Sequence, residues 1–345
     1  MNAPLSLHLL PTSIEHELFG PMAVPTFAEV QEAADRIAPY IRRTPLLFSR
    51  SLSDMAGGEV WLKPECLQIT GSFKLRGAFN AILSLTPEQR EQGVIAYSTG
   101  NHGQAIAWAA DVLNVNATIV MPADAPKNKV QKALAKGAKV VQYDRMTQSR
   151  EAIGMQLLAE TGATLIPPGD SPAVLAAQGT VALEALQDLP AATRNQLALF
   201  AAPCGGGGMM AGCNLTLQAL SPGTRRVAVE PAAFDDTVRS LASGTREHNA
   251  KSAQSICDAL QAVTPAQLPF TINQPLLGQA ISVNDNEVLA AMRFALEDLR
   301  LVVEPGGAVA LAALLAGKLP LHGASAVIVL SGANVDMPLL VQALA

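Results

Sequence analysis

The fold class is most evident in the stretch at residues 94–143, VIAYSTGNHGQAIAWAADVLNVNATIVMPADAPKNKVQKALAKGAKVVQY. Three short runs rich in β-branched residues, VIAYS, ATIVM and KVVQY, alternate in it with longer helix-forming segments, and a further such segment follows at residues 150–160. Strands that alternate with helices form a parallel sheet that is covered on both faces. The stretch therefore predicts an α/β fold.

The same rhythm returns as LALFAAP from residue 197, RRVAVE from residue 225 and SAVIVLSG from residue 325. A chain of 345 residues is long enough for two domains. We therefore expect two open twisted α/β domains. Residues 26–90 plus 166–345 would form a large domain and residues 91–165 a small one, while residues 1–25 would form a loosely attached arm.

Composition excludes several classes of protein. The net charge is −5 and no basic run could follow a nucleic-acid backbone, so we expect no nucleic-acid partner. The longest apolar run, AVALAALLAG from residue 308, is too short to span a bilayer, and the N-terminus does not resemble a secretory signal. Cys66, Cys204, Cys213 and Cys257 show no C-x-x-C spacing and are read as free thiols. We expect a cytoplasmic protein without a membrane partner.

A run of four glycines, in CGGGGMMAG at residues 204–212, stands between an apolar strand and a helix-forming segment. Without Cβ atoms the backbone can approach a ligand closely, and successive N–H groups at a helix start bind phosphate. The loop lacks the lysine of a nucleotide P-loop and the G-x-G-x-x-G spacing of a dinucleotide fold. It therefore predicts a phosphate site that is not that of ATP or NAD.

Two further segments place polar groups at expected helix starts. In TGSFKLRGAFNAI, residues 70–82, Lys74 lies in the first turn, where the positive helix end lowers the pKa of an amine. In YSTGNHGQAIA, residues 97–107, hydroxyl, amide and N–H groups converge in a way that suits a carboxylate. Each segment alone is also compatible with an ordinary helix start.

The order of the motifs carries a resemblance. From about residue 40 to the end, the chain contains KPECLQITGSFKLRGAFNAI, STGNHGQAIA, MPADAPKNK, AAQGTVALE, PCGGGGMMAG, VEPAAFDDT, VEPGGAVALAALL and LSGANVD. In this order it resembles the fold-type II, tryptophan-synthase-β-like pyridoxal-phosphate enzymes, and among them the threonine and serine dehydratases and the serine racemases. The resemblance implies that pyridoxal 5′-phosphate binds in the cleft between the two domains.

The resemblance also implies roles for single residues. Lys74 would hold the cofactor as a Schiff base and later act as general base on the α-proton. Phe73 would pack near the cofactor ring, Asn101 would bind its 3-hydroxyl and Ser331 would face its nitrogen. The phosphate would bind to the backbone of Gly205, Gly206, Gly207, Gly208 and Met209.

The substrate carboxylate would bind to Ser98, Thr99, Gly100, Asn101 and His102. The implied reaction is the deamination of L-threonine or L-serine, by β-elimination of water and hydrolysis of the enamine, to a 2-oxo acid and ammonia. Such enzymes commonly form homodimers, which we expect here as well.

The resemblance further suggests a metal site and two alternative activities. In relatives, a metal site for Mg²⁺, Mn²⁺ or Ca²⁺ uses two carboxylates and one carbonyl at the spacing of Glu230, Phe234 and Asp236. The alternative interpretation is a solvated acidic loop that binds no metal. Thr99 occupies the position of the second catalytic residue of racemases, a serine, so serine racemization stays open. Arg150 falls where an arginine could pair with a β-carboxylate, which opens 3-hydroxyaspartate dehydration.

A third alternative, from another class, is a catalytically silent amino-acid sensor; the intact Lys74 and the glycine run count against it. Two departures from the family pattern, Gly169 and Ala259, would line the cofactor ring. They indicate that the substrate preference is unusual.

Overall fold

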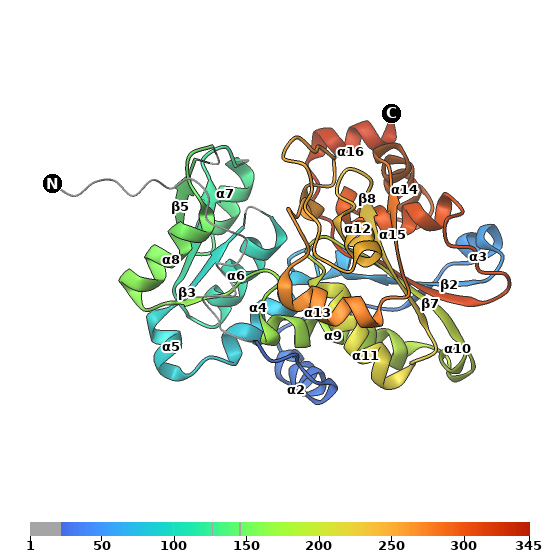
Figure 1. Ribbon diagram of the computed structural model, residues 1–345, viewed down its shortest axis with the longest axis horizontal. Helices are drawn as coiled ribbons and strands as arrows, with labels where there is room; N and C mark the ends of the chain where they lie inside the picture. The colour runs from blue at the N-terminus through green and yellow to red at the C-terminus, as the bar shows by residue number, and fades with distance from the viewer. Residues whose placement is uncertain (1–21, 99, 126, 145) are drawn as a thin grey trace.

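The structure is a computed structural model that describes residues 22–345 except residues 99, 126 and 145. It contains two α/β bodies, one built on a six-stranded sheet and the other on a four-stranded sheet (Figure 1). The predicted two-domain α/β architecture is therefore confirmed. Of the expected N-terminal arm, residues 1–21 lie outside the described residues.

The smaller sheet has the strand order β5-β4-β3-β6, and all its neighbouring strands are parallel. The alternation expected from the sequence is present, because a helix follows each of the first three strands. The elements are β3 (Val94–Tyr97), α6 (Asn101–Val112), β4 (Ala117–Pro122), α7 (Lys127–Leu134), β5 (Lys139–Tyr143), α8 (Arg150–Thr161) and β6 (Thr164–Leu165).

The larger sheet has the order β1-β2-β10-β7-β8-β9, in which only β1 is antiparallel to its neighbour. Its strands are β1 (Leu47–Phe48), β2 (Glu59–Pro64), β7 (Leu197–Pro203), β8 (Arg225–Pro231), β9 (Gln279–Val283) and β10 (Ser325–Leu330). The sequence predicted β7, β8 and β10. It did not predict β2, in which charged residues interrupt the apolar pattern.

Helices cover both faces of the larger sheet because side chains alternate along its buried strands. Leu199 and Ala201 of β7 share a core with α14 (Asp285–Glu297) and α15 (Pro305–Leu315). Phe200 and Ala202 point the other way and share a core with α9 (Pro172–Asp188) and α11 (Gly208–Leu220). A sheet buried on both faces explains why LALFAAP is a continuous apolar run.

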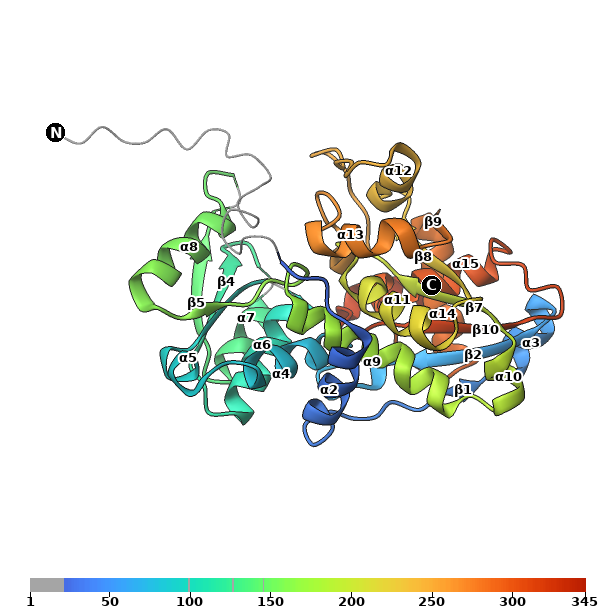
Figure 2. The same cartoon turned by 60° about the horizontal axis from the view of Figure 1, so that its bottom comes forward.

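One helix, α4 (Lys74–Leu83), packs against both α6 of the smaller body and α9 of the larger one (Figure 2). The remaining elements are α2 (Phe27–Ile37), α3 (Arg50–Ala56), η1 (Glu65–Leu67), α5 (Pro87–Gln92), α10 (Ala191–Asn195), α12 (Asp236–Ser243), η2 (Asp258–Leu260), α13 (Gln267–Leu276) and α16 (Met337–Leu344). The domain bounds expected from the sequence stay a prediction.

All four cysteines are buried and free, as the sequence indicates. Within the described part of the chain, no helix combines the length and the apolar character that crossing a bilayer requires.

Helices α9 and α11 pack with their backbones in contact. A Cβ atom added at Gly212 of α11 would lie 2.5 Å from the Gly179 nitrogen of α9, and closer still to the Leu175 carbonyl oxygen. Both obstacles are backbone atoms, which cannot rotate away. A glycine is therefore required at this crossing.

We predict that Gly212→Ala lowers the free energy of unfolding by about 3 kcal/mol, the range of core overpacking. The control is Gly223→Ala, where a Cβ would meet nothing within 4 Å. That change should alter stability by less than about 0.5 kcal/mol. Urea unfolding followed by the fluorescence of Trp61 and Trp108 measures both. Equal stability of the two variants would contradict the packing argument.

Candidate active site

A cavity of about 1510 Å³ lies between the two bodies and is lined by residues of both. Every described residue that the sequence analysis assigned to the cofactor or the substrate lines it. These are Phe73, Lys74, Ser98, Gly100, Asn101, His102, Arg150, Gly205, Gly206, Gly207, Gly208, Met209 and Ser331. Thr99 lies outside the described residues.

Lys74 is the first residue of α4 and follows Phe73, which offers no side-chain cap to the helix. Its amine donates a hydrogen bond to the carbonyl of Pro168 at 3.0 Å and lies 5.2 Å from the centre of the Phe73 ring. Burial lowers the pKa of this amine to about 8. With this pKa, roughly one tenth of the Lys74 amine is neutral at pH 7 and about half at pH 8, so the form that a nucleophile or base requires is populated.

The glycine loop joins the end of β7 to the start of α11, whose N-terminus has no side-chain cap. Gly207 has φ +89°, a conformation that side chains rarely adopt, and its carbonyl accepts a hydrogen bond from the Asn273 amide at 3.1 Å. The Gly206 carbonyl accepts one from the backbone N–H of Ala266 at 3.1 Å. With these carbonyls occupied, the helix start presents N–H groups to the cavity, which suits an anion.

Asn101 begins α6, and neighbouring side chains hold its amide on both sides. It donates to a Glu304 carboxylate oxygen at 2.6 Å and accepts from the Asn334 amide at 2.7 Å. Gly100 is the N-cap residue of this helix and donates its N–H to the Ser98 hydroxyl at 3.1 Å. The loop expected to bind a carboxylate is thus a second helix N-terminus that faces the cavity.

His102 is buried and neutral. Its Nε2–H donates to the carbonyl of Ile166 at 2.9 Å, and Nδ1 has no hydrogen-bond partner among the described residues. Burial, together with the positive charge of Lys74, lowers the pKa of the imidazole to about 3. The side chain therefore supplies no positive charge to a bound carboxylate near neutral pH.

Arg150 is the first residue of α8, and its guanidinium carbon lies 5.2 Å from the centre of the Tyr97 ring. The helix dipole disfavours a cation at this end. Stacking on an aromatic face offsets part of that cost. The position places a guanidinium in the wall that the smaller body contributes to the cavity.

Ser331 follows β10, is buried, and accepts a hydrogen bond from the backbone N–H of Phe73 at 3.2 Å through its carbonyl. Gly169 and Ala259 also line the cavity. A Cβ atom at Gly169 would lie 3.0 Å from the Cβ of Ala266, so a larger residue there would crowd the cavity wall.

The three residues expected to bind a metal lie outside the cavity lining. Glu230 accepts the backbone N–H groups of Thr237 and Val238 at 3.1 and 3.0 Å, whereas Oδ2 of Asp236 is buried without a partner among the described residues. Burial and the charge of Asp236 raise the pKa of Glu230 to about 8; burial raises that of Asp236 to about 6. The described residues contain no group of three His, Cys, Asp or Glu that could hold a metal, so backbone carbonyls or water would have to complete a site.

The sequence analysis missed the residues that hold the assigned ones in place. Glu304 occupies the N-cap position of α15 without a side-chain capping bond, and its carboxylate accepts a hydrogen bond from Asn101, 203 positions away. Its place directly before the Pro-Gly-Gly of VEPGGAV is a helix-start signal that could have indicated it. The Pro168 carbonyl and the Asn273 amide have no such signal.

Comparisons with known proteins agree with this geometry. A family model described as pyridoxal-phosphate dependent enzyme matches residues 37–332. The L-threo-3-hydroxyaspartate ammonia-lyase of Saccharomyces cerevisiae is 43% identical over 316 residues, which cover 92% of this chain and 95% of that protein. The L-threonine ammonia-lyase of Thermotoga maritima is 35% identical and covers 90% of this chain and 76% of its own length.

Among solved structures, maize serine racemase matches with a TM-score of 0.87 and 35% identity, covering 93% of this chain and 97% of that one. The predicted fold-type II architecture is therefore confirmed. Since relatives with three different activities match over most of the chain, the side chains in the cavity have to discriminate among substrates.

The residues of the cavity fit pyridoxal phosphate. A buried amine of lowered pKa can hold an aldehyde. The uncapped start of α11 can hold the phosphate through its backbone N–H groups. Gly207 is required in this loop, because it has φ +89° and a Cβ atom there would lie 2.9 Å from the Asn273 amide nitrogen. The groups suited to an aldehyde and to a phosphate thus line one cavity.

The neutral state of His102 predicts a pH-dependent stability. The unfolded chain protonates this imidazole below its ordinary pKa of about 6.5, whereas the folded protein holds it neutral down to about 3. Stability should fall as pH falls through this window, by about 2 kcal/mol between pH 7 and pH 5 from this group alone. Urea unfolding at a series of pH values should show that His102→Gln loses less unfolding free energy between pH 7 and pH 5 than the wild type does. His248→Gln, at an exposed histidine, is the control and should keep the wild-type slope.

Proposed function

Because the chain belongs to the family of pyridoxal-phosphate dependent enzymes, we propose that it is an ammonia-lyase for β-hydroxy amino acids whose preferred substrate is L-threo-3-hydroxyaspartate. The overall reaction would release a 2-oxo acid and ammonia. The observation that carries the choice of substrate is the Arg150 guanidinium in the cavity that also contains Lys74.

Pyridoxal phosphate, when bound, supplies an electron sink for the α-carbon of the substrate. Lys74 would hold the cofactor covalently, Phe73 would pack against the ring, and Asn101 and Ser331 would lie at its polar positions. The backbone of Gly205, Gly206, Gly207, Gly208 and Met209 would bind the phosphate, which the uncapped start of α11 supports.

The N-terminus of α6 would bind the α-carboxylate through Ser98, Thr99, Gly100, Asn101 and His102. When free, the amine of Lys74 would take the α-proton at Nζ. Its lowered pKa supports this role, because a base has to be unprotonated at the working pH. The carbonyl of Pro168 accepts a hydrogen bond from Nζ and so orients its lone pair.

The β-carboxylate of hydroxyaspartate would pair with Arg150. A guanidinium forms two parallel hydrogen bonds with a carboxylate. The start of α8 adds backbone N–H groups, which also favour an anion.

The second candidate is the deamination of L-threonine or L-serine. Ala152 and Ile153 line the cavity beside Arg150 and would contact the threonine methyl group. Serine racemization would use the Thr99 hydroxyl as a second catalytic group, and chiral chromatography of recovered serine detects it. A silent amino-acid sensor would bind these substrates without releasing keto acid.

We predict that the cofactor-loaded protein forms keto acid and ammonia fastest from L-threo-3-hydroxyaspartate in a panel with L-threonine and L-serine. Arg150→Met should lower kcat/KM for hydroxyaspartate about 100-fold, since a charge-assisted bidentate contact is worth about 3 kcal/mol. The same change should leave kcat/KM for threonine within about threefold, because threonine lacks a β-carboxylate.

Arg50→Met is the matched control, because Arg50 also begins a helix but lies outside the cavity lining. It should leave both substrates unaffected. An equal loss for both substrates in Arg150→Met would refute the role of Arg150, and no keto acid from any of the three would refute the lyase.

We also propose a structural divalent cation at Glu230, the Phe234 carbonyl and Asp236. One oxygen of Asp236 is buried without a partner among the described residues, and its charge raises the pKa of the nearby Glu230. A hard cation would relieve this repulsion. We further propose that the protein is a cytoplasmic homodimer. Analytical ultracentrifugation of the purified protein tests whether it is a dimer.

Addition of Ca²⁺, Mg²⁺ or Mn²⁺ to EDTA-treated protein should raise Tm by about 2–5 °C at a hundredfold excess over Kd. Asp236→Asn should abolish the shift, whereas Asp54→Asn at an exposed position should keep it. A shift that survives in Asp236→Asn would place the cation elsewhere.

A further inference from the structure

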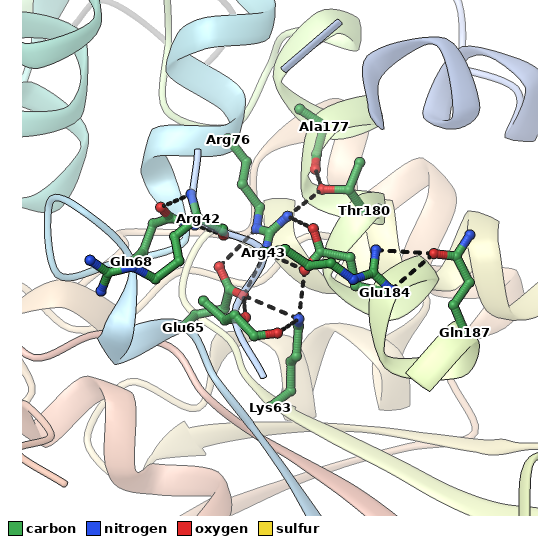
Figure 3. Close-up of polar contacts among 12 residues, drawn as sticks. Arg42, Arg43, Lys63, Glu65, Gln68, Arg76, Ala177, Thr180, Glu184 and Gln187 are labelled. Carbon is green, nitrogen blue, oxygen red and sulfur yellow. Dashed lines mark hydrogen bonds and ion pairs between the residues drawn. The ribbon is translucent and has the colours of Figure 1, made fainter. Parts of the chain in front are cut away.

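Four charged side chains form a buried charge network behind the cavity: Lys63, Glu65, Arg76 and Glu184 (Figure 3). The side chains of Lys63, Glu65 and Arg76 are 0% exposed and that of Glu184 is 9% exposed. The network contains two cations and two anions, so its net charge is zero. None of its members lines the cavity.

Arg76 is the centre of the network. Its Nε and Nη2 donate to the two carboxylate oxygens of Glu65, both at 2.8 Å. Nη1 and Nη2 donate to the two oxygens of Glu184, both at 2.7 Å. Nη1 also donates to the Thr180 hydroxyl at 3.0 Å. The five N–H groups of the guanidinium are thereby all satisfied.

Lys63 compensates the negative charge of Glu184. Its amine donates to Glu184 at 2.6 Å and to the carbonyl of Thr44 at 2.7 Å. The Thr44 hydroxyl in turn donates to Glu65 at 2.6 Å. The network therefore ties α4 to α9 and to the segment that follows β2.

Stability alone does not account for this arrangement, because burying charges costs free energy that their attraction offsets only in part. Its place in the fold suggests another role. Arg76 lies two residues after Lys74, so the two side chains leave α4 roughly 200° apart around the helix axis. Lys74 lines the cavity, whereas Arg76 bonds to Glu65 and Glu184 on the opposite side of α4.

We propose that Arg76, held by Glu65 and Glu184, is a positioning residue that fixes the first turn of α4 and so places the Lys74 amine at the cofactor site. The inference rests on the proposed role of Lys74 as the cofactor lysine. The first turn of α4 has no side-chain cap that could do this instead. Reacting groups displaced by about 1 Å lose up to about 100-fold in rate.

The test is the double variant Arg76→Met/Glu65→Gln, which removes one opposite-charge pair and leaves the Lys63–Glu184 pair intact. Apoprotein is mixed with pyridoxal phosphate, quenched with borohydride at set times, and Lys74 modification is quantified by peptide mass spectrometry. We expect attachment about 10- to 100-fold slower than in the wild type, with kcat per loaded site reduced in proportion and KM little changed.

The matched control is Arg226→Met, at another buried arginine, which bonds to Leu276 and Gln218 and lies outside the network. It should lose stability in urea yet attach the cofactor at the wild-type rate. If the double variant does not fold, Arg76→Lys tests the proposal instead. It keeps the positive charge but cannot bond to both Glu65 and Glu184 as the guanidinium does, so it should also slow the attachment of the cofactor.

Wild-type attachment in a folded Arg76 variant would overturn the proposal. A wild-type protein that is not modified at Lys74 would instead refute the proposed function, and this inference with it. The first result concerns only the variants and the second only the wild type, so the two failures are distinguishable.

Discussion

The structure depends on one geometric constraint: parallel strands of two separate sheets end at the same cavity, and several helices begin there. The first residues of α4, α6, α8 and α11 all line it, and the N-cap residue of α15 does so as well. Helix starts carry partial positive charge and unpaired N–H groups. Such a cavity suits anions, among them a phosphate and the carboxylates of an amino acid. The Lys74 amine, whose pKa burial lowers to about 8, begins one of these helices.

The features that the sequence predicted are those encoded over short distances. The glycine run, the Lys74 turn and the Ser98 to His102 loop each join a strand or turn to a helix within a few residues, so their backbone geometry is local. Strand β2 was missed because Glu59 and Lys63 break its apolar pattern, yet Lys63 is fully buried by pairing with Glu184, 121 positions away. The contacts of Asn101 with Glu304 and Asn334 are equally remote in sequence. Pairs of this kind leave no periodic signal, and only the folded chain reveals them.

The groups proposed for the substrate and those proposed for the cofactor lie mainly on different bodies. The smaller body contributes the α6 start and Arg150, the larger body contributes the glycine loop and Ser331, and Lys74 begins α4, which packs against both bodies. Groups that would bind the substrate thus lie mainly on one side and groups that would bind the cofactor mainly on the other. Substitutions in the smaller body can alter substrate preference while the cofactor site keeps its geometry. Relatives with different activities that share this architecture are consistent with such a division.

The contact between α9 and α11 has a consequence for the choice of cofactor. Helix α9 packs on α11, whose first turn ends the glycine loop, and also on α4, whose first residue is Lys74. Helix α9 therefore fixes the separation between Lys74 and the glycine loop. If these two groups hold the two ends of the cofactor as proposed, the cavity would select a phosphorylated aldehyde by the distance between its carbonyl carbon and its phosphate.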